Sequence, residues 1–339
     1  MFERNIYDYY HLYCDSRFTI GEYEGFQAGG MSYLLLPKEE CASNEQEMLK
    51  YAEYLRSIGD TSVLELQPTV YQSHVGLVDG QDVYVCALPV NDNRQAFRVN
   101  TDDEKGAHLA AIHYYGKQMP VHQKTFDYYG QWHNLWQKRL EQLEDWYQQV
   151  LAQGPQTIVD ESFLFTYPYF MGLTENAIQY VVDANYDDRG KEQEKGTICH
   201  RRFTDQTWLT LSENGDIVKK PTEFVYDHSC RDIAEWIRSH RASQDWREIL
   251  SFLEGYEQYE PLSTYGWRLT YARLLFPLHY FETIESYYRT QLPERKQFYG
   301  EQFMALLENE IENERFLEFF SERIRLPRTR GMTPSIDWI

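Results

Sequence analysis

Chemically versatile side chains gather between residues 197 and 236, beginning with Cys199 and His200. A thiol next to an imidazole is the pair that activates a cysteine nucleophile. Adjacent residues of an extended chain point to opposite faces, so we expect Cys199 to be a core residue rather than a nucleophile. Five further polar residues of this segment are important for deciding whether catalysis is present or has been lost. They are Arg202, Thr207, Lys220, Asp227 and Asp232.

The elements that must position these residues are a hairpin and a helix. The apolar runs TWLTL and IV flank Asn214-Gly215, which is the strongest short hairpin signal in the chain. A rigid hairpin with polar loop residues is a common place for chemistry. We expect residues 207–226 to form this hairpin and to be structural. Its apolar residues are Trp208, Leu209, Leu211, Ile217, Val218, Phe224 and Val225.

This layout resembles the catalytic segment of the aminoglycoside-phosphotransferase-like kinases. Within them it resembles the spore coat protein S and YutH-like endospore coat-associated family, whose VYD-x-x-x-RDL stretch is similar to VYDHSCRDIAEW here. The resemblance covers nearly the whole chain. In that superfamily the loop reads His-Gly-Asp with an Asn five residues after the Asp, and a hairpin leads to a metal-binding Asp. His200 matches the His, but the other positions are Arg201, Arg202, Thr207 and Lys220.

These replacements remove what the reaction needs. Phosphoryl transfer requires magnesium on the phosphate oxygens and a carboxylate that orients the attacking hydroxyl. Arg202 stays charged at any working pH and cannot accept a proton. Lys220 repels a divalent cation, and the hydroxyl of Thr207 is a weak substitute for an amide oxygen. The resemblance therefore implies a degenerate catalytic loop.

A second alignment would make Asp227 the metal ligand. Its spacing from His200 is several residues longer than the motif requires, so we favour Lys220 as the equivalent position. Under this alternative the protein would be a phosphotransferase that uses ATP and magnesium.

Asp232 stands at the start of an amphipathic helix in which Ile233, Trp236 and Ile237 can share the buried face. A carboxylate in the first turn accepts backbone N–H bonds and faces the positive end of the helix dipole. The resemblance implies that this residue ties the helix to the loop near His200. We expect Asp232 to be a structural anchor rather than a metal ligand.

Residues 1–90 read as a small mixed lobe. YEGFQAGGMSYLLLP predicts two strands joined at Gly29-Gly30, without a G-x-G-x-x-G or Walker A pattern. The resemblance puts a phosphate-binding lysine on the following strand, and the residue there is Leu36. A helix is expected over 44–58, ending at Gly59. Further strands are expected at Thr69–Ser73 and Val83–Leu88.

Residues 91–339 read as a mostly helical lobe. His108 and His113 are five residues apart and do not share a helix face, and the chain has no HExxH motif, so we expect no metal site. The helices are expected at Lys105–Tyr115, Gln131–Leu151, Leu173–Ala184, Asp245–Glu254, Thr264–Phe281 with a break at Pro277, and Glu294–Phe320.

The amino-acid composition indicates which partners and which cellular compartment to expect. The 339 residues carry 53 acidic and 33 basic side chains, a net charge of −20, which argues against binding nucleic acid or an anionic membrane. No apolar run reaches the length of a membrane span, and MFERNIYDYYHLY lacks the features of a signal peptide. We expect synthesis in the cytoplasm. The five cysteines are far apart, which fits free thiols.

Tyrosine is abundant, with 28 residues. Ordinary packing explains such a number, and adhesion or cross-linking in an assembled layer is the alternative.

Taken together, these features predict an α+β, two-lobed protein-kinase-like fold, with a small N-lobe built on an antiparallel sheet and a larger helical C-lobe. We expect a non-catalytic protein, associated with the endospore coat, that binds coat proteins and needs no cofactor. The alternative is an active or nucleotide-binding phosphotransferase of the aminoglycoside or choline kinase type.

Overall fold

The computed structural model of the chain describes residues 1–89, 98–120, 128–187, 194–211, 215–241 and 246–323. The chain forms two compact units that alternate along the sequence. Unit 1 consists of residues 1–128, 195–232 and 251–261, and unit 2 consists of residues 129–194, 233–250 and 262–339. The lobe boundary expected at residues 90 and 91 falls outside the described residues and stays a prediction.

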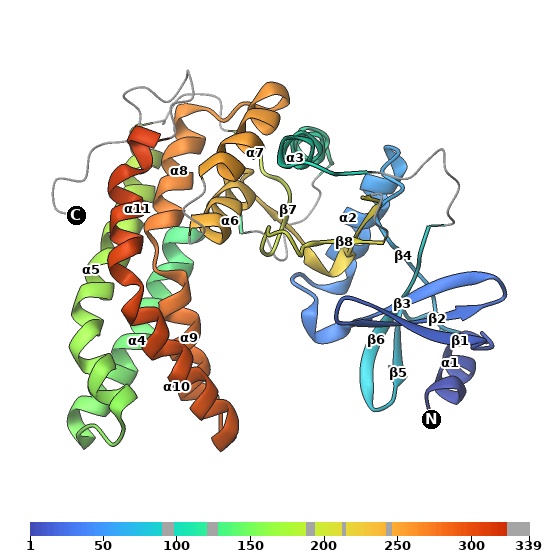
Figure 1. The fold of residues 1–339 in the computed structure, drawn as a ribbon, viewed down its shortest axis with the longest axis horizontal. Helices are drawn as coiled ribbons and strands as arrows, with labels where there is room; N and C mark the ends of the chain where they lie inside the picture. Colours follow the sequence, from blue (N-terminus) through green and yellow to red (C-terminus); the bar gives the residue numbers. More distant parts are fainter. Residues whose placement is uncertain (90–97, 121–127, 188–193, 212–214, 242–245, 324–339) are drawn as a thin grey trace. The chain divides into compact units, whose positions relative to one another are not determined.

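Unit 1 begins with the antiparallel sheet that the sequence predicts (Figure 1). The strand order is β1-β2-β3-β6-β4, and β5 also pairs with β6. Gly29 and Gly30 form the turn between β2 and β3, with φ of 58° and 79° that glycine adopts without strain. The elements are α1 (Phe2–Tyr10), β1 (Ser16–Ile20), β2 (Tyr23–Ala28), β3 (Met31–Pro37), η1 (Lys38–Glu40), α2 (Glu45–Ser57), β4 (Glu65–Leu66), β5 (Val75–Val78) and β6 (Gln81–Ala87).

Both faces of β3 are buried, and its side chains alternate between two apolar clusters. Tyr33 and Leu35 join the side chains of α1, whereas Leu34 and Leu36 join Met48 of α2. The helix expected over 44–58 is confirmed, because the Asn44 side chain caps it by accepting the Glu47 N–H.

One strand prediction was wrong, and three strands were missed. The strands β1, β4 and β5 were not expected, and Thr69–Ser73 is a loop instead of a strand. Within this loop the Thr69 hydroxyl accepts the Ser73 N–H, and the Thr69 N–H donates to the Ser73 carbonyl. Such local hydrogen bonds use backbone groups that would otherwise pair with a neighbouring β-strand.

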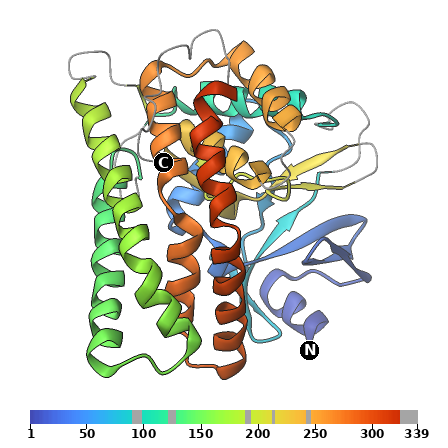
Figure 2. The same ribbon diagram turned by 60° about the vertical axis from the view of Figure 1, so that its left-hand side comes forward.

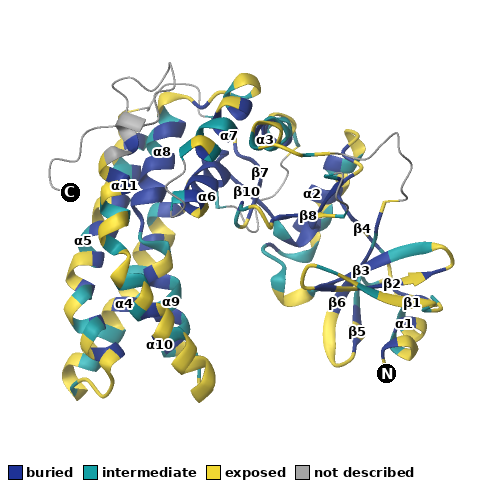
Figure 3. Ribbon diagram, in the orientation of Figure 1, coloured by how far each residue is buried: buried dark blue, intermediate teal, exposed yellow. Residues whose placement is uncertain are grey.

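The hairpin predicted for residues 207–226 is confirmed for β8 (Trp208–Thr210) and β9 (Ile217–Lys219). Gly215 has a φ of 79°, and Asn214 lies outside the described residues. The chain then passes through η2 (Pro221–Glu223) into β10 (Phe224–Asp227), which pairs with β7 (Thr197–His200) and leads to α6 (Cys230–His240). The strands β7 and β10 and nearly all of α6 are buried (Figure 3).

Phe224→Ala is expected to lower the free energy of unfolding by about 3 kcal/mol, because the fully buried ring pairs across the ladder with His200 and leaves a cavity when removed. Urea denaturation followed by circular dichroism measures this loss. The exposed Phe165→Ala is the matched control, and a loss for Phe224→Ala no larger than for that control would exclude this segment from the core.

Unit 1 also contains α3 (Asp102–Gly116), which crosses the end of α7 (Trp246–Tyr259) at two glycines. A Cβ on Gly106 would lie 2.0 Å from the Phe252 carbonyl oxygen. A Cβ on Gly255 would lie 2.0 Å from the Asp103 carbonyl oxygen. The two backbones therefore touch directly, without side chains between them.

Unit 2 is helical, and α4 packs along α5, α5 along α8, and α9 along α10 (Figures 1 and 2). The predicted break at Pro277 is confirmed. No helix in the described part of the chain combines the length and apolar character that a membrane crossing requires. The remaining helices are α4 (Trp132–Gln153), α5 (Ile158–Asp187), α8 (Thr264–Leu275), α9 (Leu278–Arg289), α10 (Pro293–Glu308) and α11 (Glu310–Arg323).

Two helix predictions in unit 2 were wrong in extent. The helix expected from Leu173 begins at Ile158 and continues through Pro168, because the buried Phe163, Tyr167 and Phe170 hold both sides of the proline in the core. The single helix expected over 294–320 breaks at Asn309, whose amide side chain donates to the Ala305 carbonyl. This bond occupies a helix-terminal acceptor.

Candidate functional site

The centre of the candidate site is the fully buried carboxylate of Asp232 on α6. Its two oxygens accept the backbone N–H of His200 at 3.0 and 3.1 Å. The imidazole Nδ1 of His200 lies 2.7 Å from Oδ2, and Nε2 of His113 lies 3.3 Å from the same oxygen. Asp232 thus has the contacts to the loop backbone that an anchor needs.

Hydrogen bonds determine which tautomer the His200 ring adopts. The indole N–H of Trp208 points to His200 Nε2 at 3.0 Å, and an indole can only donate. Nε2 is therefore unprotonated, and the proton on Nδ1 is donated to Asp232. His200 is a neutral ring with both nitrogens occupied.

The second imidazole, His113 on α3, is also fully buried. Burial lowers its pKa, and the nearby Asp232 does not reverse this shift. A neutral ring donates from Nε2 to Asp232 and accepts at Nδ1 from the Tyr256 hydroxyl at 2.8 Å. Burial alone would raise the pKa of Asp232, but His200 and His113 lower it to about 2.

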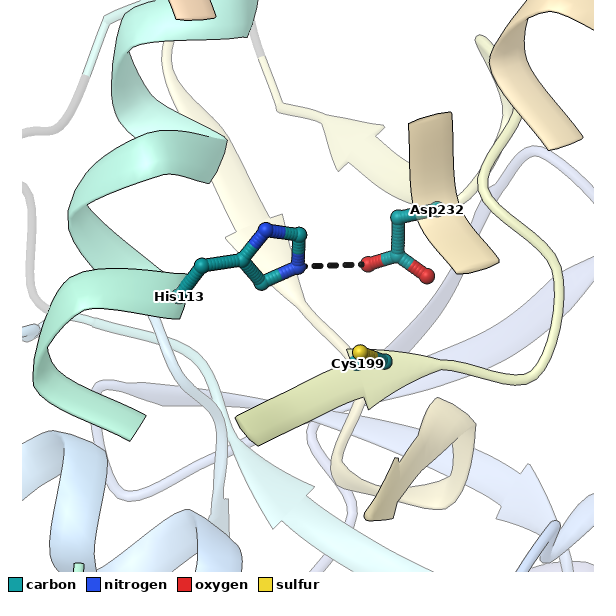
Figure 4. Close-up of side chains that lie close together, drawn as sticks. All are labelled: His113, Cys199 and Asp232. Carbon is teal, nitrogen blue, oxygen red and sulfur yellow. Dashed lines mark hydrogen bonds and ion pairs between the residues drawn. The ribbon is translucent and has the colours of Figure 1, made fainter. Parts of the chain in front are cut away.

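His113, Cys199 and Asp232 lie close enough together to be considered as metal ligands (Figure 4). The Cys199 thiol donates to the carbonyls of Asp227 and His228, and burial holds its pKa well above the usual range. A metal would need the thiolate and would have to break the hydrogen bonds around Asp232. This donor set fits a protonated structural cluster, and the absence of a metal site stays a prediction.

The degenerate loop is closed by Thr207. Its hydroxyl donates to the Arg202 carbonyl at 2.7 Å and accepts the Thr204 N–H at 2.8 Å. Both bonds lie inside the loop, so this hydroxyl shapes the backbone where the resemblance would have a metal-binding amide. The Arg202 side chain is half-buried, and that of Arg201 is exposed.

Asp227, the fallback metal ligand, is fully buried at the end of β10. One oxygen pairs with Arg231 Nη1 at 2.8 Å, and the other accepts the His228 N–H at 2.8 Å. Arg231 also donates to the carbonyls of His200 and Arg201. Asp227 therefore holds an arginine that ties α6 to the loop.

The last residue of β9, Lys219, has a fully buried ammonium group. It lies 2.7 Å from Asp60 Oδ2, 2.5 Å from Ser62 Oγ and 2.6 Å from His108 Nε2. Burial and the adjacent ammonium lower the pKa of His108 to about 3, so this ring is neutral and accepts from Lys219. Burial lowers the pKa of Lys219 as well, but Asp60 opposes that shift.

The next residue, Lys220, points to the start of β2. Its ammonium group donates to the Tyr23 hydroxyl at 2.6 Å and lies 3.3 Å from Glu223 Oε1. The Tyr23 hydroxyl donates in turn to Glu40 at 2.9 Å. The side chain of Lys220 is only 6% exposed. This chain of bonds joins the hairpin to the sheet through a lysine where the resemblance would have a metal-binding aspartate.

Leu36 lies on the same face of the sheet as Tyr23. Both belong to one apolar cluster, which also contains Leu209 and Val218 of the hairpin. The position that the resemblance assigns to a phosphate-binding lysine is thus buried in an apolar cluster that also includes side chains of the β8–β9 hairpin.

Most of the residues that the sequence analysis missed at this site have a partner far away in the sequence, and the exception is Trp208, which donates to the nearby His200. Lys219 could have been suspected from its place beside Lys220, because neighbours on a strand face opposite ways. The other missed residues are Tyr23, Asp60, Trp208 as a hydrogen-bond donor, and Arg231.

Comparison with known proteins identifies one family by sequence and one fold by structure. A family model described as "Spore coat putative kinase YutH" matches residues 3–320. The endospore coat-associated protein YutH of Bacillus subtilis (strain 168) is 35% identical over 323 residues, which cover 94% of this chain and 91% of that protein.

Two solved structures are similar in fold. The aminoglycoside phosphotransferase from Alicyclobacillus acidocaldarius subsp. acidocaldarius DSM 446 has a TM-score of 0.64 at 14% identity, covering 94% of this chain and 95% of that one. The spectinomycin phosphotransferase APH(9)-Ia, in complex with ADP and spectinomycin, has a TM-score of 0.62 at 13% identity, covering 95% and 98%. The predicted kinase-like fold is confirmed.

Proposed function

Because this chain belongs to the spore coat putative kinase YutH family, we propose that it is a non-catalytic, kinase-fold protein of the endospore coat that acts through binding. The observation that carries the proposal is Lys220. Its ammonium group is buried and bonded to Tyr23 and Glu223, at the position that the resemblance assigns to the metal-binding carboxylate. A fixed positive charge there opposes the binding of magnesium.

Lys219 contributes in a different way. Its ammonium group pairs with Asp60, so the two consecutive lysines occupy two carboxylates, those of Asp60 and Glu223. Magnesium prefers carboxylate and phosphate oxygens in an octahedral arrangement. The carboxylates of Asp60 and Glu223 are already bonded to the two ammonium groups.

The other positions of the loop support the same conclusion. Arg202 cannot act as a base, and the Thr207 hydroxyl is used inside the loop. Asp227 is the remaining candidate for metal binding, and its carboxylate is paired with Arg231. The burial of Leu36 in an apolar cluster with side chains of the hairpin supports the proposal that apolar side chains fill the position where a nucleotide would bind.

A thermal-shift titration with ATP and magnesium tests this proposal. We expect no rise in Tm above that given by magnesium alone, because a ligand raises Tm only by binding the folded state. An active aminoglycoside phosphotransferase, measured in parallel, must show a rise. A rise for this protein without phosphate transfer would indicate a nucleotide-binding pseudokinase.

Phosphate transfer from ATP that requires magnesium and is lost in Asp227→Ala would overturn the proposal in favour of an active phosphotransferase. Asp187→Ala, an exposed aspartate of unit 2, is the matched control and should not change such activity.

A further inference from the structure

Unit 2 has a small cavity of about 30 Å³, partly open to solvent, between α5, α6, α8, α9 and α11. Its walls are mainly apolar, for example Phe276 and Leu317. Two arginines, Arg238 and Arg241, line the cavity as well. A cavity of this size admits one or two groups as large as a water molecule.

One of the two guanidinium groups has its partners inside the protein. Arg238 donates to Glu235 at 2.6 Å and also to the Arg273 carbonyl. Arg273 donates to the same Glu235 oxygen at 2.7 Å. A single carboxylate thus serves two arginines directly.

Arg241, by contrast, has no direct hydrogen bond or close ion pair among the described residues, although the carboxylates of Glu310 and Glu235 raise its pKa from farther away. It is mostly buried, and burial lowers its pKa to about 10. A buried cation normally has an anionic partner, because its desolvation is costly otherwise. A guanidinium group binds a planar carboxylate through two parallel hydrogen bonds.

We propose that this cavity is a binding site for a single carboxylate group, which Arg241 would hold at the end of α6. The apolar walls exclude water and so strengthen the ion pair. The carboxylate could belong to a small free acid or to a side chain of a partner protein, and both present the same chemistry. The site lies in unit 2 and does not depend on the proposal for unit 1.

Glu310 is the internal competitor for Arg241. It lines the same cavity, accepts a hydrogen bond from Asn313 at 2.9 Å, and has a pKa raised by burial. If Glu310 were the true partner of Arg241, removing its charge would destabilise the fold. If an external carboxylate binds, removing that charge would remove a repulsion and strengthen binding.

The experiment is a thermal melt of the full chain in sodium acetate and in sodium chloride at equal ionic strength. At ten times the dissociation constant, acetate should raise Tm by about 2 °C over chloride. Glu310→Gln should enlarge this rise, and Arg241→Gln should abolish it while leaving Tm in chloride unchanged or higher. Arg295→Gln, an exposed arginine of α10, is the matched control and should keep the rise.

Two further probes identify the source of the bound group and test whether it is a carboxylate. N-acetyl-glutamate amide binding more tightly than acetate points to a protein side chain, and equal binding points to a small free acid. Inorganic phosphate giving the larger rise would overturn the carboxylate assignment. An equal rise in Arg241→Gln, or a lower Tm of Glu310→Gln in chloride without a response to acetate, would overturn the site.

Discussion

Asp232→Ala is expected to lower the free energy of unfolding by about 5 kcal/mol. The substitution leaves three donors inside the protein without an acceptor: the His200 N–H, the His200 ring N–H and the His113 ring N–H. Each buried donor without a partner costs about 1–3 kcal/mol. Urea denaturation at pH 7 measures the loss.

Asp232→Asn should cost much less, about 2 kcal/mol, because a carbonyl oxygen in the place of Oδ2 still accepts from both imidazole rings and only the backbone N–H of His200 then faces the amide group. The exposed Asp187→Ala, which removes a surface pair with Arg268, should cost under about 1 kcal/mol. An Asp232→Ala protein as stable as this control would reject the anchor role.

The same carboxylate predicts a dependence of stability on pH. The pKa of Asp232 is lowered in the folded protein, to about 2, so its contribution is complete above the unfolded value near 4 and is lost as pH falls from about 4 to 2. That contribution is about 2–3 kcal/mol. Between pH 4 and 2 the stability of Asp232→Asn should therefore fall less steeply than that of the parent.

Lys219→Ala is expected to have the second largest effect, a loss of about 4 kcal/mol. The substitution leaves the carboxylate of Asp60 inside the protein without its ammonium partner, and removing one member of a buried ion pair costs about 3–5 kcal/mol. The exposed pair of Lys38 and Asp82 offers the control, because Lys38→Ala should cost under about 1 kcal/mol.

A double variant separates the ion pair from simple packing. Lys219→Met combined with Asp60→Asn removes both charges and keeps most of the volume, so it should recover most of the stability lost in Lys219→Ala. If the double variant were less stable than Lys219→Ala, the charge of Asp60 would not be the cause. A single variant within about 1 kcal/mol of the parent would show that Asp60 finds other donors.

Local signals predicted the elements that carry the site. Asn44 caps its helix, Gly29-Gly30 forms the predicted turn, and the apolar runs around Gly215 form the hairpin, because each of these features depends on residues close in sequence. The strand prediction for Thr69–Ser73 was wrong although the bonds of this loop are also local. A hydrogen bond between a hydroxyl group and the backbone cannot be recognised from the pattern of hydrophobic residues.

The contacts of the site depend on distant residues. The resemblance suggested that Asp232 meets the backbone near His200, but nothing in the local sequence points to His113, which is 119 positions away. Likewise, Lys219 and Lys220 look alike in the sequence. Only the fold directs one to Asp60 and the other to Tyr23.

The glycine crossing of α3 and α7 limits how this protein family can diverge. Gly255 is adjacent to Tyr256, whose hydroxyl bonds to His113 on the opposite helix at 2.8 Å. A side chain at Gly106 or Gly255 would force the helices apart and stretch this bond, although neither glycine touches Asp232. Two positions without side chains thus constrain a polar network that lies beyond them. A relative that keeps the His113–Tyr256 pair should keep both glycines, and one that loses a glycine should have rebuilt the pair.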